Sequence, residues 1–186
     1  SVSLTAASRQ IATSSTQVSA SGKAGGGAIS VAGGTGDGGG LFTSGTYSVT
    51  SSHGVGGGVA VHGHDIKMVD SKVDASGATG GGSIAIGHSG VGASRSIDAD
   101  NILVSPTSTF KADAIQSGNG GSITFWSNLA TDFMGTATAK GGALSGNGGF
   151  LEVSSRGEVG FWGLGDAFTD RDAAAPILKR LADPET

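Results

Sequence analysis

Short runs in which every second residue is apolar recur along this chain, and a glycine pair introduces each run. The unit is Gly-Gly-x-φ-x-φ, where φ is apolar, and full copies start at residues 26, 56, 81, 120 and 148. Successive side chains of a β-strand point to opposite faces, so each run predicts a strand with one face in a core. The predicted core residues are Ile29, Val31, Val59, Val61, Ile84, Ile86, Ile123, Phe125, Leu151 and Val153. The alternate residues predicted to face solvent are Ser30, Ala60, Ala85, Thr124 and Glu152.

More of the chain repeats than the glycine pair. Two shorter extended runs precede each copy, as in QIATSSTQVSASGKAGGG (10–27) and DIKMVDSKVDASGATGGG (65–82). Each unit therefore consists of a strand, a turn, a strand, a glycine corner and a strand, with a degraded copy of the corner at 38–43. Variable spacing is tolerated because extra residues can leave a coil as surface loops. We predict an all-β fold, a right-handed parallel β-helix with about three strands per coil.

The composition changes near the C-terminus, which divides the chain into two parts. Residues 1–165 form the predicted β-helix repeat region, and residues 166–186 form a non-repeat cap or linker. Within that second part, Pro176 is expected to open a short helix with Ile177, Leu178 and Leu181 on one side. A contact with another subunit is the alternative role of this tail.

The composition excludes several classes of protein. The chain has 186 residues, 36 glycines without a strict three-residue period, no cysteine and a net charge of -4. Collagen, disulfide frameworks and thiolate metal sites are therefore excluded, and no basic cluster suggests nucleic acid as a partner. No apolar run is long enough to span a bilayer. The chain begins at Ser1, so we expect a mature chain or a fragment, whose first extended run (SVSLTAAS) continues an upstream coil or docks on another subunit.

Two histidines are the candidate metal ligands. His62 and His64 in VAVHGHDI have the parity opposite to Val59 and Val61, so both are predicted to face outward. Paired imidazoles suit a transition metal or a haem edge. No third ligand is evident, because Asp65 has the wrong parity unless the strand ends there. Two solvated surface histidines are the alternative, and no resident cofactor is predicted. His53 and His88 stand beside glycines and are interpreted as turn residues.

Acids and aromatic rings supply the other candidate chemistry. Hydrolases on β-helices need clustered carboxylates, and the candidates are Asp65, Asp70, Asp74, Asp98 and Asp100. Without a basic residue at a matching position in a neighbouring coil, we expect solvated loop acids and no enzymatic activity. The large rings gather in the final third, where they either fill and cap the core or form an exposed row for sugar stacking. They are Phe125, Trp126, Phe133, Phe150, Phe161 and Trp162.

Residues 118–157 closely resemble a recurrent segment of filamentous-haemagglutinin-like large exoproteins, which are adhesins of the two-partner secretion class. The matching residues are Trp126, Phe133, Gly135 to Ala139, Gly141, Gly142 and Gly146 to Ser154. The resemblance extends more loosely through coils such as DASGATGGGSIAIG (74–87). It implies a long right-handed β-helix exported through an outer-membrane partner transporter of a Gram-negative bacterium. It further implies a secreted or cell-surface protein with roles in adhesion, biofilm or virulence. No secretion domain of that family is found at the N-terminus.

Two classes of function remain open. The first is a structural and adhesive rod that assembles end to end, by contacts with itself, and touches host cells or matrix polysaccharide. The second is a carbohydrate-active enzyme on the same scaffold, and haem or metal capture through His62 and His64 is a further alternative. An enzyme predicts a concave groove with converging acids, whereas a rod predicts smooth faces of Ser and Thr. The small outward residues favour the rod.

Overall fold

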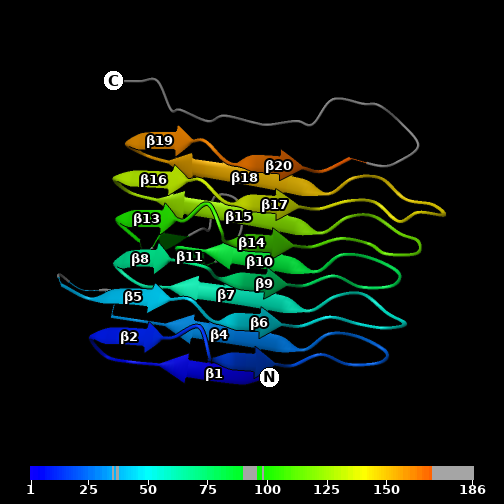
Figure 1. The fold of residues 1–186 in the computed structure, drawn as a ribbon, viewed down its shortest axis with the longest axis horizontal. Coiled ribbons are helices and arrows are strands. Elements are labelled where there is room, and N and C mark those ends of the chain that lie inside the picture. The colour runs from blue at the N-terminus through cyan, green and yellow to red at the C-terminus, as the bar shows by residue number, and fades with distance from the viewer. Residues whose placement is uncertain (35, 37, 90–95, 98, 169–186) are drawn as a thin grey trace.

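The repeats stack into a column of coils, shown in Figure 1. The computed structural model describes residues 1–34, 36, 38–89, 96–97 and 99–168, and no helix occurs among them. Each coil contributes one strand to each of three parallel sheets, and every sheet has six strands. The all-β parallel solenoid with three strands per coil is confirmed.

The strands follow the predicted order within each coil. The first sheet contains β1 (Val2–Thr5), β4 (Ala28–Ala32), β7 (Gly58–His62), β10 (Ser83–Ile86), β15 (Ser122–Ser127) and β18 (Phe150–Ser155). The second contains β2 (Arg9–Ala12), β5 (Gly40–Thr43), β8 (Asp65–Met68), β13 (Asn101–Val104), β16 (Ala130–Phe133) and β19 (Glu158–Phe161). The third contains β3 (Gln17–Ser19), β6 (Thr46–Ser48), β9 (Lys72–Asp74), β14 (Thr109–Lys111), β17 (Thr136–Thr138) and β20 (Leu164–Asp166).

The first sheet carries the apolar stacks that the alternation predicts. Equivalent residues of neighbouring coils pair without a register slip, so Ile84 lies between Val59 and Ile123. All ten predicted core residues are buried. Because a slip of one residue would turn every apolar side chain to the outside, burial of one face fixes this register.

The degraded copy at 38–43 was assigned to the wrong part of the coil. It forms β5 of the second sheet, where Leu41 pairs with Ile66 of the next coil. The preceding strand, β4, already occupies the first sheet in this coil. The run at 38–43 follows β4 after one bend, so it must lie on the second sheet. Its glycines nevertheless resemble the glycine pair that precedes strands of the first sheet.

Aromatic side chains fill the core of the C-terminal coils, which is the first of the two alternatives predicted for the large rings. Phe125 is fully buried, with its ring 5.0 Å from the rings of both Phe110 and Phe133. Phe161 stacks on Phe133 at 5.4 Å and extends the cluster into the last coil. Phe150 and Trp162, in contrast, are exposed. The rings therefore do not behave as one group.

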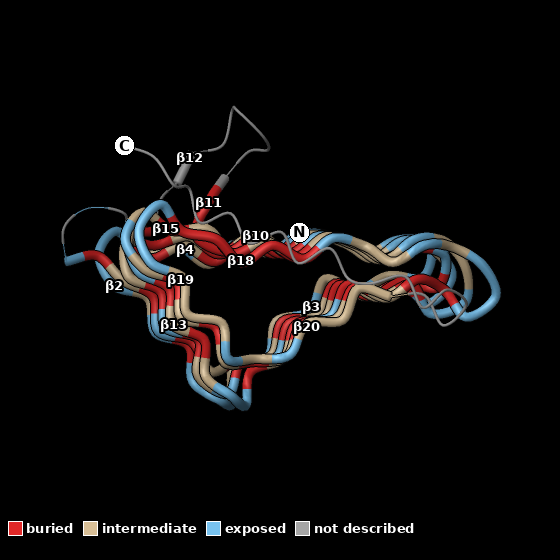
Figure 2. The backbone as a smooth tube through the Cα atoms, turned by 90° about the horizontal axis from the view of Figure 1, so that it is seen from above, coloured by how far each residue is buried: buried red, intermediate tan, exposed pale blue. Residues whose placement is uncertain are grey.

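A flat arm extends from each of the first five coils, between its strand in the third sheet and the next strand of the first sheet, on the right of Figure 2. It comprises residues 20–27, 49–57, 75–82, 112–121 and 139–149, which occupy equivalent positions in successive coils. The second glycine of each pair closes the base of the arm. The Gly57 amide donates to the Val49 carbonyl at 2.7 Å, and the Gly82 amide donates to the Ala75 carbonyl at 2.8 Å.

Close approach between coils explains the glycine pairs. A Cβ atom on Gly81 would lie under 3.0 Å from the Ala112 carbonyl of the next coil. A Cβ atom on Gly82 would lie equally close to the Gly57 carbonyl of the preceding coil. Gly118 and Gly146 are the first residues of the two Gly-Asn-Gly-Gly corners, and their φ angles are 89° and 118°. Glycine is required there because other residues rarely adopt a positive φ.

Most residues predicted to face outward are partly exposed, but Glu152 is not. Ser30, Ala60, Ala85 and Thr124 are of intermediate exposure, as the alternation predicts. Glu152 is only 6% exposed, and its Oε1 accepts a hydrogen bond from the Ser154 hydroxyl at 3.1 Å. The prediction for Glu152 was wrong because β18 is buried on both faces from Leu151 to Ser155.

One insertion interrupts the column in the fourth coil. The short strands β11 (His88–Ser89) and β12 (Ser96–Ile97) pair antiparallel between β10 and β13. The Ala99 amide donates to the Gly87 carbonyl at 3.1 Å, which brings the two ends of the insertion together. The main register of the coil is unchanged on either side.

The last strand reaches Asp166, one residue beyond the predicted end of the repeat region. Residues 169–186, including the helix expected from Pro176, lie outside the described residues. The division at residues 165 and 166 therefore stays a prediction.

Candidate functional site

The bend between the first and second sheets holds the predicted residue His64. Strand β7 ends at His62 and β8 begins at Asp65, so His64 falls between two strands. The alternation rule therefore does not govern its direction. Its amide donates to the Gly34 carbonyl at 2.9 Å, and its carbonyl accepts from the Asp100 amide at 2.7 Å. The residue is thereby fixed in the column of stacked bends.

Two carboxylates approach the His64 ring, one from each side. Nε2 lies 3.1 Å from Oδ2 of Asp100, and Nδ1 lies 3.4 Å from Oδ2 of Asp65. The side-chain amide of Asn101 donates to Oδ1 of Asp65 at 2.8 Å, and that of Asn128 donates to Oδ1 of Asp100 at 3.0 Å. The Asn101 hydrogen bond, with a smaller effect of His64, lowers the pKa of Asp65.

Only one of the two acidic partners of His64 could be expected from its neighbours in the sequence. Asp65 adjoins it in the chain, but Asp100 comes from the next coil. Within the part of the chain that the structure describes, no group of three or more His, Asp and Glu residues is placed to hold a metal ion. The metal site at His62 and His64 stays a prediction that no observation tests.

The remaining candidate acids lie apart from this cluster. Asp70 accepts a hydrogen bond from the Thr107 hydroxyl, and its own amide donates to Ser105 Oγ at 3.0 Å. Asp74 Oδ1 accepts from the Ser76 amide at 2.9 Å. Asp98 lies outside the described residues. Of the four predicted acids that the structure describes, Asp65 and Asp100 are brought together, and they meet at His64.

The other two histidines differ from each other. His53 lies exposed in a bend of the arm, as predicted, with Nδ1 2.9 Å from the Ser52 hydroxyl. His88 was interpreted as a turn residue, which is wrong. It is 3% exposed, forms part of β11 and has Nε2 2.7 Å from the Thr124 hydroxyl. The cause is Gly87, whose φ of 82° turns the chain back after β10.

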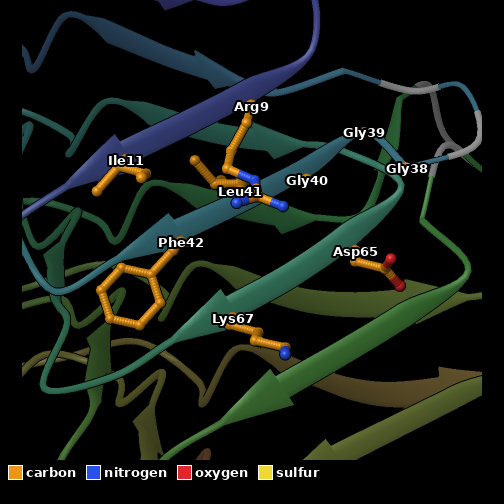
Figure 3. A pocket seen from close by; sticks show the side chains of 9 residues that line it. All are labelled: Arg9, Ile11, Gly38, Gly39, Gly40, Leu41, Phe42, Asp65 and Lys67. Carbon is orange, nitrogen blue, oxygen red and sulfur yellow. The ribbon is translucent and has the colours of Figure 1, made fainter.

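An open pocket of about 470 Å³ lies on the outer face of the second sheet, over β2, β5 and β8. Two outward rows build it. Arg9, Gly40 and Asp65 pair in one row, and Ile11, Phe42 and Lys67 pair in the other. Gly40 has no side chain between Arg9 and Asp65, so the middle of the first row is hollow. Figure 3 shows Arg9 extending across β5 toward this hollow.

The lining of the pocket combines apolar surface with positive charge. Ile11 is 60% exposed and Phe42 is 39% exposed. Arg9 and Lys67 are exposed, and neither forms an ion pair with any residue of the described ranges. Asp65, the carboxylate of the lining, is held by Asn101 and His64 on its other side. The pocket therefore offers two basic groups beside an apolar surface.

Sequence reasoning did not find this pocket. Arg9, Phe42 and Lys67 come from three successive coils, and no local motif joins them. The signal that was available is the register: once each coil is aligned on its second strand, these residues fall in two adjacent outward rows.

Comparisons with protein-family models and with curated proteins find no match to the chain. The resemblance to filamentous-haemagglutinin-like exoproteins consequently rests on the residues quoted above. No helix among the described residues has the length and apolar character needed to cross a bilayer.

Proposed function

We propose that this chain is a structural and adhesive β-solenoid segment of a bacterial exoprotein, secreted or displayed on the cell surface. Such a segment would be exported through an outer-membrane partner transporter and would contact cells or polysaccharide through its flanks. The observation that carries the proposal is the unbroken register of six coils in all three sheets, which makes a rod with repeating outer faces.

The outer faces support contact with other molecules over a broad area. The outward row Ser30, Ala60, Ala85 and Thr124 is built from small side chains. The third sheet presents Thr46, Thr109 and Thr136 in one outward row with Lys72. Small side chains leave the backbone accessible, and the serine and threonine hydroxyl groups of these rows lie on coils that stack at about 4.8 Å.

End-to-end assembly forms part of the same proposal. β1, β2 and β3 are edge strands of the three sheets. An edge strand offers unpaired amide and carbonyl groups to a further strand. A coil of a longer chain or of another molecule would extend all three sheets at once.

The lining of the pocket supports binding over hydrolysis. Glycoside hydrolases need a pair of carboxyl groups on opposite sides of the scissile bond. The pocket on the second sheet has Asp65 as its carboxylate, beside Arg9 and Lys67. We therefore propose adhesion without catalysis as the role of this segment.

A glycan array with a parallel product assay tests the proposed function. The purified chain, fluorescently labelled, is applied to immobilised polysaccharides and to cultured epithelial cells, and released reducing ends are measured in the same samples. We expect retention on at least one surface with no release of reducing ends. Retention on neither cells nor any polysaccharide would contradict the proposal, and release of reducing ends would favour the enzyme.

A further inference from the structure

We propose that the pocket over Gly40 binds a glycan that carries uronic acid residues. The inference rests on the proposed adhesive function and names both the surface and the class of ligand. The occupant places a carboxylate between Arg9 and Lys67 and an apolar sugar face against Phe42.

Charge complementarity selects an anionic ligand. The chain as a whole has a net charge of -4, yet this pocket contains two cations without an internal ion pair. Asp65 is the carboxylate of the lining, held by Asn101 and His64, and it also attracts Lys67, so the pocket sets two cations against one anion and keeps a net positive charge. A guanidinium group binds a carboxylate through two parallel hydrogen bonds, and a lysine adds a flexible point charge.

The apolar surface selects a ligand with a flat hydrophobic face. Phe42 and Ile11 are neighbours in one outward row, and both are exposed without an apolar cover. Aromatic surfaces of this kind pack well against flat apolar faces, including the C–H face of a pyranose ring. Lys67 follows Phe42 in the same row, so a ring that stacks on Phe42 brings its substituents beside a cation.

The size and shape of the pocket fit a short stretch of a polymer. Its volume of about 470 Å³ lies within the usual range for small-ligand sites, roughly 300–1,000 Å³. The pocket is open on the outer face of a sheet, so a chain can pass through it without threading. Gly40 supplies the space, since any side chain at that position would project between Arg9 and Asp65.

Calorimetric titration with a galacturonic acid trisaccharide tests the inference on the full chain. We expect binding that weakens as salt is raised, because the contact is between exposed charges. Arg9→Gln and Lys67→Gln should each weaken binding by about tenfold, the usual effect of one hydrogen bond to a charged group. Phe42→Ala should weaken binding to a similar degree. Gly40→Val should fill the hollow between Arg9 and Asp65, and so block binding, without removing any charged group.

Matched variants control for loss of charge and loss of apolar surface. Lys111→Gln removes an exposed lysine of β14 from the third sheet, in the coil next to that of Lys67. Phe150→Ala removes a phenylalanine that is 43% exposed, close to the 39% of Phe42. Neither should change the affinity. Circular dichroism of each variant confirms that the coils are folded, which is expected because none of these side chains lies in the core.

Other outcomes overturn the inference and leave the proposed function separately testable. Unchanged affinity in the pocket variants would mean that uronates bind elsewhere. Equal binding of a neutral galactose trisaccharide would remove the role of Arg9 and Lys67. Tighter binding of a hexaglutamate peptide would replace the glycan with an acidic protein as partner. Absence of uronate binding would refute this site, whereas retention on cells or other polysaccharides would still support adhesion.

Discussion

Truncation of one core ring tests the stacked core most directly. Phe125 is fully buried in the first sheet, and its ring is 5.0 Å from both Phe110 and Phe133. Phe125→Ala would leave a cavity that the surrounding strands cannot close, because each is held in register by coils above and below. Such substitutions cost about 3–5 kcal/mol of unfolding free energy. Two aromatic contacts are lost together, so we expect a value near the middle of that range, about 4 kcal/mol.

The expected change in melting temperature follows from the length of the chain. For a protein of roughly 150–250 residues, 1 kcal/mol shifts the melting temperature by about 2–4 °C, so we expect a decrease of about 8–16 °C. Thermal unfolding followed by far-ultraviolet circular dichroism measures it, and urea unfolding gives the free energy independently. Phe150→Ala is the matched control, since it removes the same side chain from an exposed position of the next coil.

The comparison of these two variants shows whether Phe125 packs in the core. The exposed ring of Phe150 should contribute less than about 1 kcal/mol, as surface substitutions usually do. If Phe125→Ala and Phe150→Ala were equally stable within that margin, Phe125 would not face a packed interior. The strand register and the aromatic cluster described above would then both be wrong.

Three further perturbations test separate features. Gly121→Val should prevent normal stacking of the coils, because its Cβ would lie under 3.0 Å from the Gly82 carbonyl; Gly36→Ala, which meets no atom within 4 Å, should leave the melting temperature unchanged. The lowered pKa of Asp65 means that its ionised form stabilises the fold above about pH 4, and that this stabilisation is lost as the pH falls through the lowered pKa. Asp65→Asn should therefore reduce the difference in urea midpoint between pH 7 and pH 2, and an unchanged difference would contradict the pKa shift. Haem or metal capture through the candidate histidines predicts an absorbance change on titration that His62→Ala abolishes, and the absence of any change in the unmodified chain would end that hypothesis.

The core of the first sheet could be predicted from the sequence because a single rule governs it. Alternation from the glycine pair places Ile84 and Ile86 inside, and stacking repeats the same choice in every coil. The same rule failed at Glu152, since alternation assigns a face to a residue but cannot say whether that face is covered. The prediction for His88 rested instead on the neighbouring glycine, which suggested a turn, but Gly87 itself makes the turn with its positive φ and β11 begins at His88.

The polar cluster and the pocket could not be predicted, because both depend on contacts between coils. Asp100 reaches His64 only when the bend of one coil stacks on the bend of the next. Arg9 and Lys67 become neighbours of Phe42 only in the observed register. Coil lengths vary with insertions, so spacing in the chain does not give that register until the strands of the second sheet are assigned.

The closed insertion in the fourth coil makes this rod a natural carrier. Its two ends meet through the hydrogen bond from the Ala99 amide to the Gly87 carbonyl, so the inserted segment begins and ends at one place on the column. The coils on both sides keep the same pairing around the insertion, and His88 is buried at its base beside Thr124. A foreign epitope or a small folded domain grafted there would project from the flank at a fixed height, without disturbing the scaffold that presents it.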